Sequence, residues 1–166
     1  AVRASCDAIL IGATTLRNDN PRLLVRSAER RAERVARGTS PSPTKVTVTR
    51  LGQLDATANF FTLGPADKVV YCATAGATEA HRRLDGVATV VDAGRDVDMH
   101  WLIDDLGDRG VRRLMVEGGR TIVTQFLAAG LADELQLVVA PFFVGDSRGC
   151  RLVGDGTFPW HRDNRA

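Results

Sequence analysis

Cysteine is scarce in this chain, and its spacing is as informative as its number. The 166 residues include three cysteines, Cys6, Cys72 and Cys150, which stand far apart and are odd in number. Such a set does not form a disulfide framework, and the absence of a CxxC pair argues against a structural zinc site. We therefore expect reduced thiols, a cytoplasmic location and no metal centre.

Other absences exclude whole classes of function. The three histidines are scattered without ligand spacing, and the zinc signature of nucleobase deaminases, H-x-E with P-C-x-x-C, does not occur. No run approaches the roughly 20 apolar residues of a membrane span. The formal net charge of +2 is too small to indicate nucleic acid as a partner.

The composition is that of one globular domain, with 44% apolar and 25% charged residues. Apolar, β-branched runs predict strands, and amphipathic runs with caps predict helices. Strands are expected at 7–12, 46–49, 69–72, 87–91, 113–117 and 134–144, the last interrupted by Pro141, and helices at 27–37, 78–84, 98–110 and 121–129. Because strands and helices alternate, we predict an α/β fold, a mostly parallel central sheet flanked by helices in a single domain.

A glycine pair marks the most informative segment, 114–121. Its apolar strand ends in Glu117, Gly118 and Gly119, and a helix follows at Arg120 and Thr121. Glycines allow a ligand to approach the backbone closely, and a helix start offers free N–H groups to a phosphate. The alternative is a plain strand-to-helix turn.

A second segment, 12–26, adds a polar corner of Asp19, Asn20 and Pro21, followed by Arg22 and Arg26. The surrounding residues 1–50 are basic, with ten Lys and Arg against four Asp and Glu, which suits a phosphate-bearing small ligand. A solvated helix at 28–34 and an Asx-type turn at 19–21 are the structural alternatives.

Taken together, the two segments resemble the reductase domain of riboflavin biosynthesis, a family with the dihydrofolate reductase fold. The match rests on 7–12 with Thr15, on 19–26, on 115–119 and on 131–146, in family order. The resemblance implies an NADPH-dependent oxidoreductase of the 5-amino-6-(5-phosphoribosylamino)uracil reductase type. It would reduce the ribosyl group of a pyrimidine ribosylamine 5′-phosphate to ribityl, and whether the pyrimidine is deaminated stays open.

The resemblance also implies roles on the substrate side. Asp19 is expected near the substrate ribose, for proton handling or orientation, and Glu117 is expected to face the cleft, either sharing a proton or capping N–H groups. Both are thus candidate catalytic and substrate-binding residues. Arg22 and Arg26 are candidates for the 5′-phosphate, since guanidinium groups match phosphate bidentately.

On the cofactor side, the resemblance implies that NADPH lies along a set of glycines, hydroxyls and arginines. Gly118 and Gly119 would admit its pyrophosphate beside the helix start, and Thr49 with Arg50 would meet the 2′-phosphate. The full expected cofactor set is Gly12, Thr15, Thr49, Arg50, Gly118, Gly119, Arg120 and Thr121.

Two departures from the family pattern keep other interpretations open. The family's opening strand has no counterpart before residue 1, so the reductase domain is expected at 1–157 with that strand apparently missing, followed by a polar tail at 158–166. Leu24 also stands where the family often has Thr. The alternatives are a reductase of the same fold acting on a pterin, dihydrofolate-like or specialised-metabolism substrate, and a non-catalytic nucleotide-binding protein. The family further implies a homodimer, for which 135–144 could supply the interface.

Overall fold

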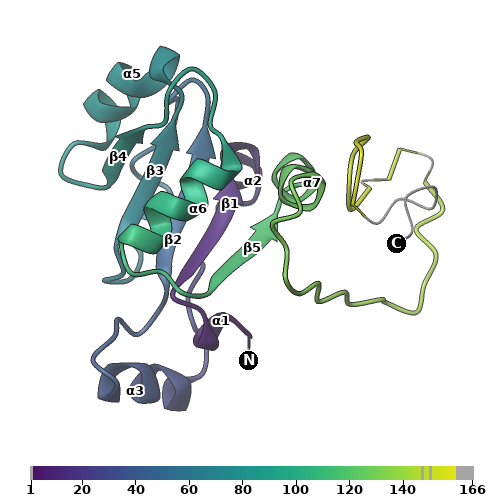
Figure 1. Cartoon of the computed structure of the whole chain (residues 1–166). Coiled ribbons are helices and arrows are strands. Elements are labelled where there is room, and N and C mark those ends of the chain that lie inside the picture. Colours follow the sequence, from purple (N-terminus) through teal and green to yellow (C-terminus); the bar gives the residue numbers. More distant parts are fainter. Residues whose placement is uncertain (1, 147, 150, 160–166) are drawn as a thin grey trace.

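The computed structural model describes residues 2–146, 148–149 and 151–159. These residues form helices and short strands that alternate along the chain (Figure 1). In chain order the elements are α1 (Val2–Ser5), β1 (Ala8–Gly12), α2 (Ala13–Asp19), α3 (Ala28–Ala36), β2 (Thr44–Thr49), α4 (Asn59–Thr62), β3 (Lys68–Cys72), α5 (Thr74–Leu84), β4 (Thr89–Asp92), α6 (Met99–Asp108), β5 (Leu114–Gly118) and α7 (Arg120–Ala128).

The described strands form one sheet in which every pairing is parallel, with the order β4-β3-β2-β1-β5. The chain moves outward from β1 to β4 and then crosses back to place β5 on the other side of β1. The predicted α/β class with a parallel sheet is therefore confirmed. In open sheets of this kind, ligands bind at the carboxyl ends of the strands where the order reverses, which here lies between β1 and β5.

Helices cover both faces of the sheet, and β1 supplies side chains to both cores. Ile9 and Ile11 pack on one face with residues of α2, α4 and α5, while Ala8 and Leu10 pack on the other with residues of α6 and α7. This alternation follows from the two-residue period of a strand. Because both faces are buried, β1 is apolar throughout, as expected for a central parallel strand.

The basic helix α3 lies beyond the amino ends of the strands, next to α1 (Figure 1). Its Arg34 is buried, and the Arg34 guanidinium donates hydrogen bonds to the carbonyls of Ala4 at 3.0 Å, Cys6 at 2.7 Å and Ser40 at 2.8 Å. Burial lowers the pKa of Arg34. The charged Arg34 of this helix therefore has a structural role as a donor to backbone carbonyls. Helix α3 lies away from the carboxyl edge of the sheet.

Most predicted elements are found within a few residues, with one clear error. The predicted strand at 134–144 is wrong, because these residues have no regular structure and run away from the sheet in an extended path (Figure 1). Its composition is strand-like, but a strand also needs a partner, and here the segment pairs with none of the described strands. Helix α5 also begins at Thr74, earlier than the expected 78, and the four-residue α4 was not predicted.

Two further features concern the chain as a whole. Among the described residues, none of the helices combines the length and apolar character needed to cross a bilayer. The predicted polar tail at 158–166 lies outside the described residues except for its first two positions.

Candidate functional site

A large cavity lies at the carboxyl edge of the sheet, at the point where the strand order reverses. It has a volume of about 1220 Å³ and is lined by the ends of β1, β2 and β5 and by residues following β3 and β4. Ligand pockets commonly have volumes of roughly 300–1,000 Å³, so this one has room for a dinucleotide and a second small ligand.

The glycine pair forms one wall of the cavity, together with the start of α7. The Gly119 N–H donates to Thr15 Oγ1 at 3.0 Å, and a Cβ on Gly119 would lie 2.6 Å from the same oxygen. Gly118 has a φ of +127° and is joined to Gly119 by a cis peptide bond. Gly119 is also the N-cap of α7 and provides no side-chain cap, so the first N–H groups of the helix remain for a ligand.

Opposite this wall, the end of α2 brings Asp19 to the cavity. Asp19 is the last residue of α2 and one of the cavity-lining residues. Asn20 follows in the left-handed conformation, with φ 42° and ψ 54°, and its N–H donates to the Leu16 carbonyl at 3.1 Å. The helix therefore stops at the cavity, and the chain turns away immediately after Asp19.

Glu117 is positioned by an irregularity in β5. Leu10 of β1 pairs with Val116, but the next residue, Ile11, pairs with Gly118, so Glu117 is an extra residue in the strand. Such a bulge redirects a side chain. The Glu117 carboxylate lines the cavity and forms an ion pair with Arg3, and its side chain is 32% exposed. The sequence left two interpretations open, a buried proton-sharing carboxylate or a cap for nearby N–H groups, and in the structure the carboxylate is partly exposed and ion-paired.

Arg3 connects Glu117 to the segment after Asp19. The Arg3 guanidinium pairs with the Glu117 carboxylate and donates a second bond to the Leu24 carbonyl at 3.2 Å. Leu24 lies between Arg22 and Arg26, which are exposed and are not among the residues lining the cavity. The structure thus brings the backbone of this segment to Glu117 without bringing the two arginines to the cavity wall.

The far end of the cavity is formed by the turn after β2. Arg50 is exposed there, whereas Thr49 is buried and its Oγ1 accepts a hydrogen bond from the Gly52 N–H at 3.2 Å. Thr49 therefore lines the cavity while its hydroxyl closes the local turn. Gly52 has a φ of +65°, and Gly76 carbonyl oxygen would lie 2.3 Å from a Cβ at this position, so the turn requires glycine.

The described lining residues carry more positive than negative charge, which favours an anionic ligand. Ten of the residues predicted from the sequence line the cavity together: Gly12, Thr15, Asp19, Thr49, Arg50, Glu117, Gly118, Gly119, Arg120 and Thr121. The remaining charged groups on its wall were not predicted, namely Arg17, Asp96 and Arg148. Arg17 follows Ala13 by one turn of α2, so helical periodicity could have indicated it. No sequence pattern could have indicated Arg3, because its contact with Glu117 depends on the order of the strands in the sheet.

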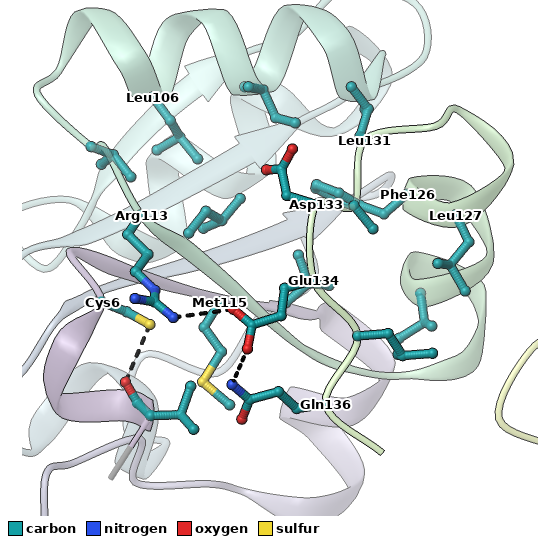
Figure 2. A pocket seen from close by; sticks show the side chains of 18 of the residues that line it. Cys6, Leu106, Arg113, Met115, Phe126, Leu127, Leu131, Asp133, Glu134 and Gln136 are labelled. Atoms are coloured by element: carbon teal, nitrogen blue, oxygen red, sulfur yellow. Dashed lines mark hydrogen bonds and ion pairs between the residues drawn. The ribbon is translucent and has the colours of Figure 1, made fainter.

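A second, smaller cavity of about 390 Å³ lies on the outer side of β5, between α6, α7 and the segment after α7 (Figure 2). Its wall is mostly apolar, with Met115, Leu127 and Leu131 among the contributors. Figure 2 shows the Arg113 guanidinium pointing to Glu134, and their ion pair measures 3.3 Å. This cavity lacks the glycine pair and the helix start, so the larger one is the candidate site. Among the described residues, no group of three His, Cys, Asp or Glu is placed to hold a metal ion.

Comparisons with known proteins identify the family of the chain. The chain matches the family described as the RibD C-terminal domain over residues 1–164. A 2,5-diamino-6-ribosylamino-4(3H)-pyrimidinone 5′-phosphate reductase from Archaeoglobus fulgidus is 36% identical over 156 residues, which cover 93% of this chain and 70% of the relative. The protein of the same name from Methanothermobacter thermautotrophicus is 35% identical, with 93% and 68% covered.

A solved structure supports the fold. A pyrimidine reductase-like protein from Corynebacterium diphtheriae superposes with a TM-score of 0.74 at 22% identity. The match covers 91% of this chain and 65% of that protein, so this chain corresponds to about two thirds of it. The family match over nearly the whole sequence, two relatives above a third identical and the shared fold lead to one conclusion: the chain belongs to the RibD C-terminal domain family of riboflavin biosynthesis, with a dihydrofolate reductase-like fold.

Proposed function

We propose that this chain is an NADPH-dependent reductase that converts the ribosyl group of a pyrimidine ribosylamine 5′-phosphate to ribityl in riboflavin biosynthesis. One observation carries the proposal: a single cavity joins the Gly118–Gly119 wall and the start of α7 to the carboxylates of Asp19 and Glu117. The first group suits a dinucleotide phosphate, and the second suits a sugar with several hydroxyls. The names of the two archaeal relatives support the same activity.

The residues around the glycine pair fit a nicotinamide dinucleotide. Thr15 leaves no room for a Cβ on Gly119, so glycine allows the start of α7 to lie close to Thr15, whereas nothing lies within 4 Å of a Cβ position on Gly118. The space beside Gly118 is therefore open to a phosphate, and the uncapped start of α7 supplies N–H donors. Gly12, Thr15, Arg120 and Thr121 complete this part of the site. The exposed Arg50, next to the buried Thr49, would hold the 2′-phosphate and so favour NADPH over NADH. When bound, the nicotinamide supplies the hydride.

The substrate would lie at the Asp19 and Glu117 end of the cavity. In the reduction, a hydride adds to C1 of the ribose, the bond from C1 to the ring oxygen opens, and that oxygen takes up a proton. Asp19 would orient the ribose or deliver this proton. Glu117, held by Arg3, would accept hydrogen bonds from ribose hydroxyls. Arg22 and Arg26 do not line the cavity, and they stay candidates for a 5′-phosphate that extends beyond its wall.

The names of the relatives also favour one form of the pyrimidine. Both archaeal relatives are named for the 2,5-diamino pyrimidinone, the form that has not been deaminated. We therefore propose this compound as the substrate in preference to the deaminated 5-amino-6-(5-phosphoribosylamino)uracil.

The direct test follows NADPH oxidation with each pyrimidine offered separately to the protein. Turnover with the diamino compound is expected. Turnover with the uracil compound alone would reverse the choice of substrate. NADPH binding without oxidation by either would favour the pterin-type or non-catalytic alternatives. In the Asp19→Ala variant, turnover should be lost while the Kd for NADPH stays within about twofold, and equal loss of both would contradict the role of Asp19.

We also propose that the protein forms a homodimer and works in the cytoplasm. Residues 135–144 include large apolar side chains that are mostly exposed, such as Val138 at 92% and Phe143 at 101%. Exposed apolar surface of this extent is typical of protein interfaces. The free thiols of Cys6 and Cys72 fit a reducing compartment.

A further inference from the structure

The corner after Asp19 has an unusual backbone. Asn20 has a φ of 42° and Leu23 a φ of 50°, so two residues other than glycine adopt the left-handed conformation within four positions. L-residues adopt this conformation rarely, although asparagine tolerates it better than most. Leu23 is buried at 3% exposure, so the segment folds back into the core directly after the corner. Such a backbone persists only where neighbouring groups hold it.

Asn59, distant in sequence, holds this corner through two hydrogen bonds. The Asn59 N–H donates to the Asn20 side-chain Oδ1 at 2.7 Å, and the Asn59 side-chain Nδ2 donates to the Asn20 carbonyl at 3.1 Å. The two residues therefore form a closed pair in which each contributes backbone and side chain. Asn59 is not among the residues that line the cavity, so its contact with the site passes through Asn20.

A buried lysine fixes the element that carries Asn59. Lys45 of β2 has 0% exposure, and its Nζ donates to the carbonyls of Phe60 at 2.8 Å, Leu63 at 2.7 Å and Asn59 at 3.4 Å. A four-residue helix such as α4 leaves the Phe60 and Leu63 carbonyls unsatisfied, whereas the Asn59 carbonyl also accepts the Leu63 N–H at 3.2 Å. Phe60 and Phe61 are themselves buried in the core. The central sheet therefore fixes α4, and α4 fixes the corner.

We propose that Asn59 is a positioning residue for Asp19, acting through Asn20, and this inference rests on the proposed reductase function. Asp19 ends α2 at the cavity, and its carboxylate has no side-chain partner among the described hydrogen bonds and ion pairs that would orient it. Its orientation then depends on the backbone that follows. Without the Asn20–Asn59 pair, the end of α2 frays, and Asp19 loses its fixed place beside the substrate.

The test compares three variants with a matched control. Asn59→Ala removes the Nδ2 donor, and Asn20→Gly keeps the left-handed backbone but removes the Oδ1 acceptor. Each should lower kcat about tenfold or more with the Kd for NADPH nearly unchanged, because small misplacement of a reacting group is costly. Asn20→Asp restores an acceptor and should recover most of the activity. Thr57→Ala, which removes an exposed bond to Asp55 two residues away, should behave like the wild type.

The outcomes separate this inference from the proposed function. A wild-type kcat in both Asn59→Ala and Asn20→Gly would overturn it, as would an equal loss of turnover and NADPH affinity. Amide hydrogen exchange provides a readout without substrate: residues 19–24 should exchange faster in Asn59→Ala than in Thr57→Ala. If the wild type reduces neither pyrimidine, the proposed function fails, and exchange unchanged by Asn59→Ala would still refute the positioning role.

Discussion

Gly119 occupies a position where one added methyl group is expected to weaken cofactor binding. Its φ of −58° is allowed for alanine, so Gly119→Ala tests only the space beside Thr15, where the new Cβ would lie 2.6 Å from Oγ1. The start of α7 or Thr15 must then move, and we expect the Kd for NADPH to rise about tenfold or more, a change of about 1.4 kcal/mol. Fluorescence titration measures it.

The matched control is Gly107→Ala, in α6, where nothing lies within 4 Å of the added Cβ. This substitution should leave NADPH affinity unchanged and stabilise the helix by roughly 0.5–1 kcal/mol. Equal NADPH affinity in Gly119→Ala and Gly107→Ala would rule out the glycine wall as the phosphate site.

Arg50 allows a prediction about cofactor choice. The Arg50→Ala variant should bind NADPH about tenfold or more weakly and NADH with little change, because only NADPH carries the 2′-phosphate. Arg37→Ala, which removes an exposed arginine at the C-cap of α3, controls for the change in net charge. The ratio of the two dissociation constants is the measurement, and a ratio equal to that of the wild type would disprove the 2′-phosphate contact.

At the scale of single residues, the sequence predicted which glycines line the cavity better than it predicted which arginines do. Gly118 ends β5, and Gly119 and Arg50 directly follow strands, so the strand ends bring all three to one edge of the sheet. Arg22 and Arg26 lie in an irregular segment whose path depends on hydrogen bonds from Arg3 and Asn59, and no local pattern reveals those contacts. Proximity to Asp19 in sequence therefore did not place these arginines on the cavity wall.

At the scale of elements, the β2–α4 contact gives the protein a pH-dependent stability. Burial lowers the pKa of Lys45 to about 8, from 10.5 for a free lysine. Between these values the unfolded chain keeps a proton that the folded protein has released, so the free energy of unfolding rises with pH across this window. Each pH unit contributes about 1.4 kcal/mol.

Lys45→Met isolates this contribution. Burial also raises the pKa of Cys72 and of Tyr71, and both shifts lower stability at alkaline pH, but they remain in the variant. The variant should be less stable, because the carbonyls of α4 lose their donor. Urea unfolding at several pH values should show the stability difference between wild type and variant widening from pH 8 upward. A constant difference would contradict a depressed lysine pKa.

The helices and strands also show which parts of the fold can be predicted from composition alone. β2 and β3 could be predicted because their β-branched runs lie within the sheet, where both faces are buried. Helix α4 has only four residues, too few for a periodic pattern, and its stability comes from Lys45. Residues 134–144 are also apolar and strand-like in composition, but no described strand pairs with them, and composition does not report the presence of a partner.

At the scale of the whole molecule, one topological feature explains the site. Because the chain returns past β1 to place β5 at the opposite side, α2 and α7 begin at neighbouring strand ends and enclose the cavity between them. Among the described strands, the same return leaves β5 at the edge of the sheet, with a small apolar cavity along its outer side. β5 thus borders both the candidate site, at its carboxyl end, and an apolar cavity that Leu135 helps to line, along its outer side.

The exposed apolar side chains of residues 135–144 predict self-association. Val138 is 92% exposed and Phe143 is 101% exposed, so replacing both with Asp should cost the isolated subunit less than about 0.5 kcal/mol. Charged groups in an apolar interface are strongly unfavourable, so the same change should convert a dimer to a monomer. Light scattering after size-exclusion chromatography, at several protein concentrations, gives the mass.

Val35→Asp, on the exposed face of α3 at 55% exposure, is the control and should leave the dimer intact. A wild-type protein that is monomeric at every concentration would refute the dimer, whereas a doubly substituted protein that stays dimeric would assign the interface to another surface.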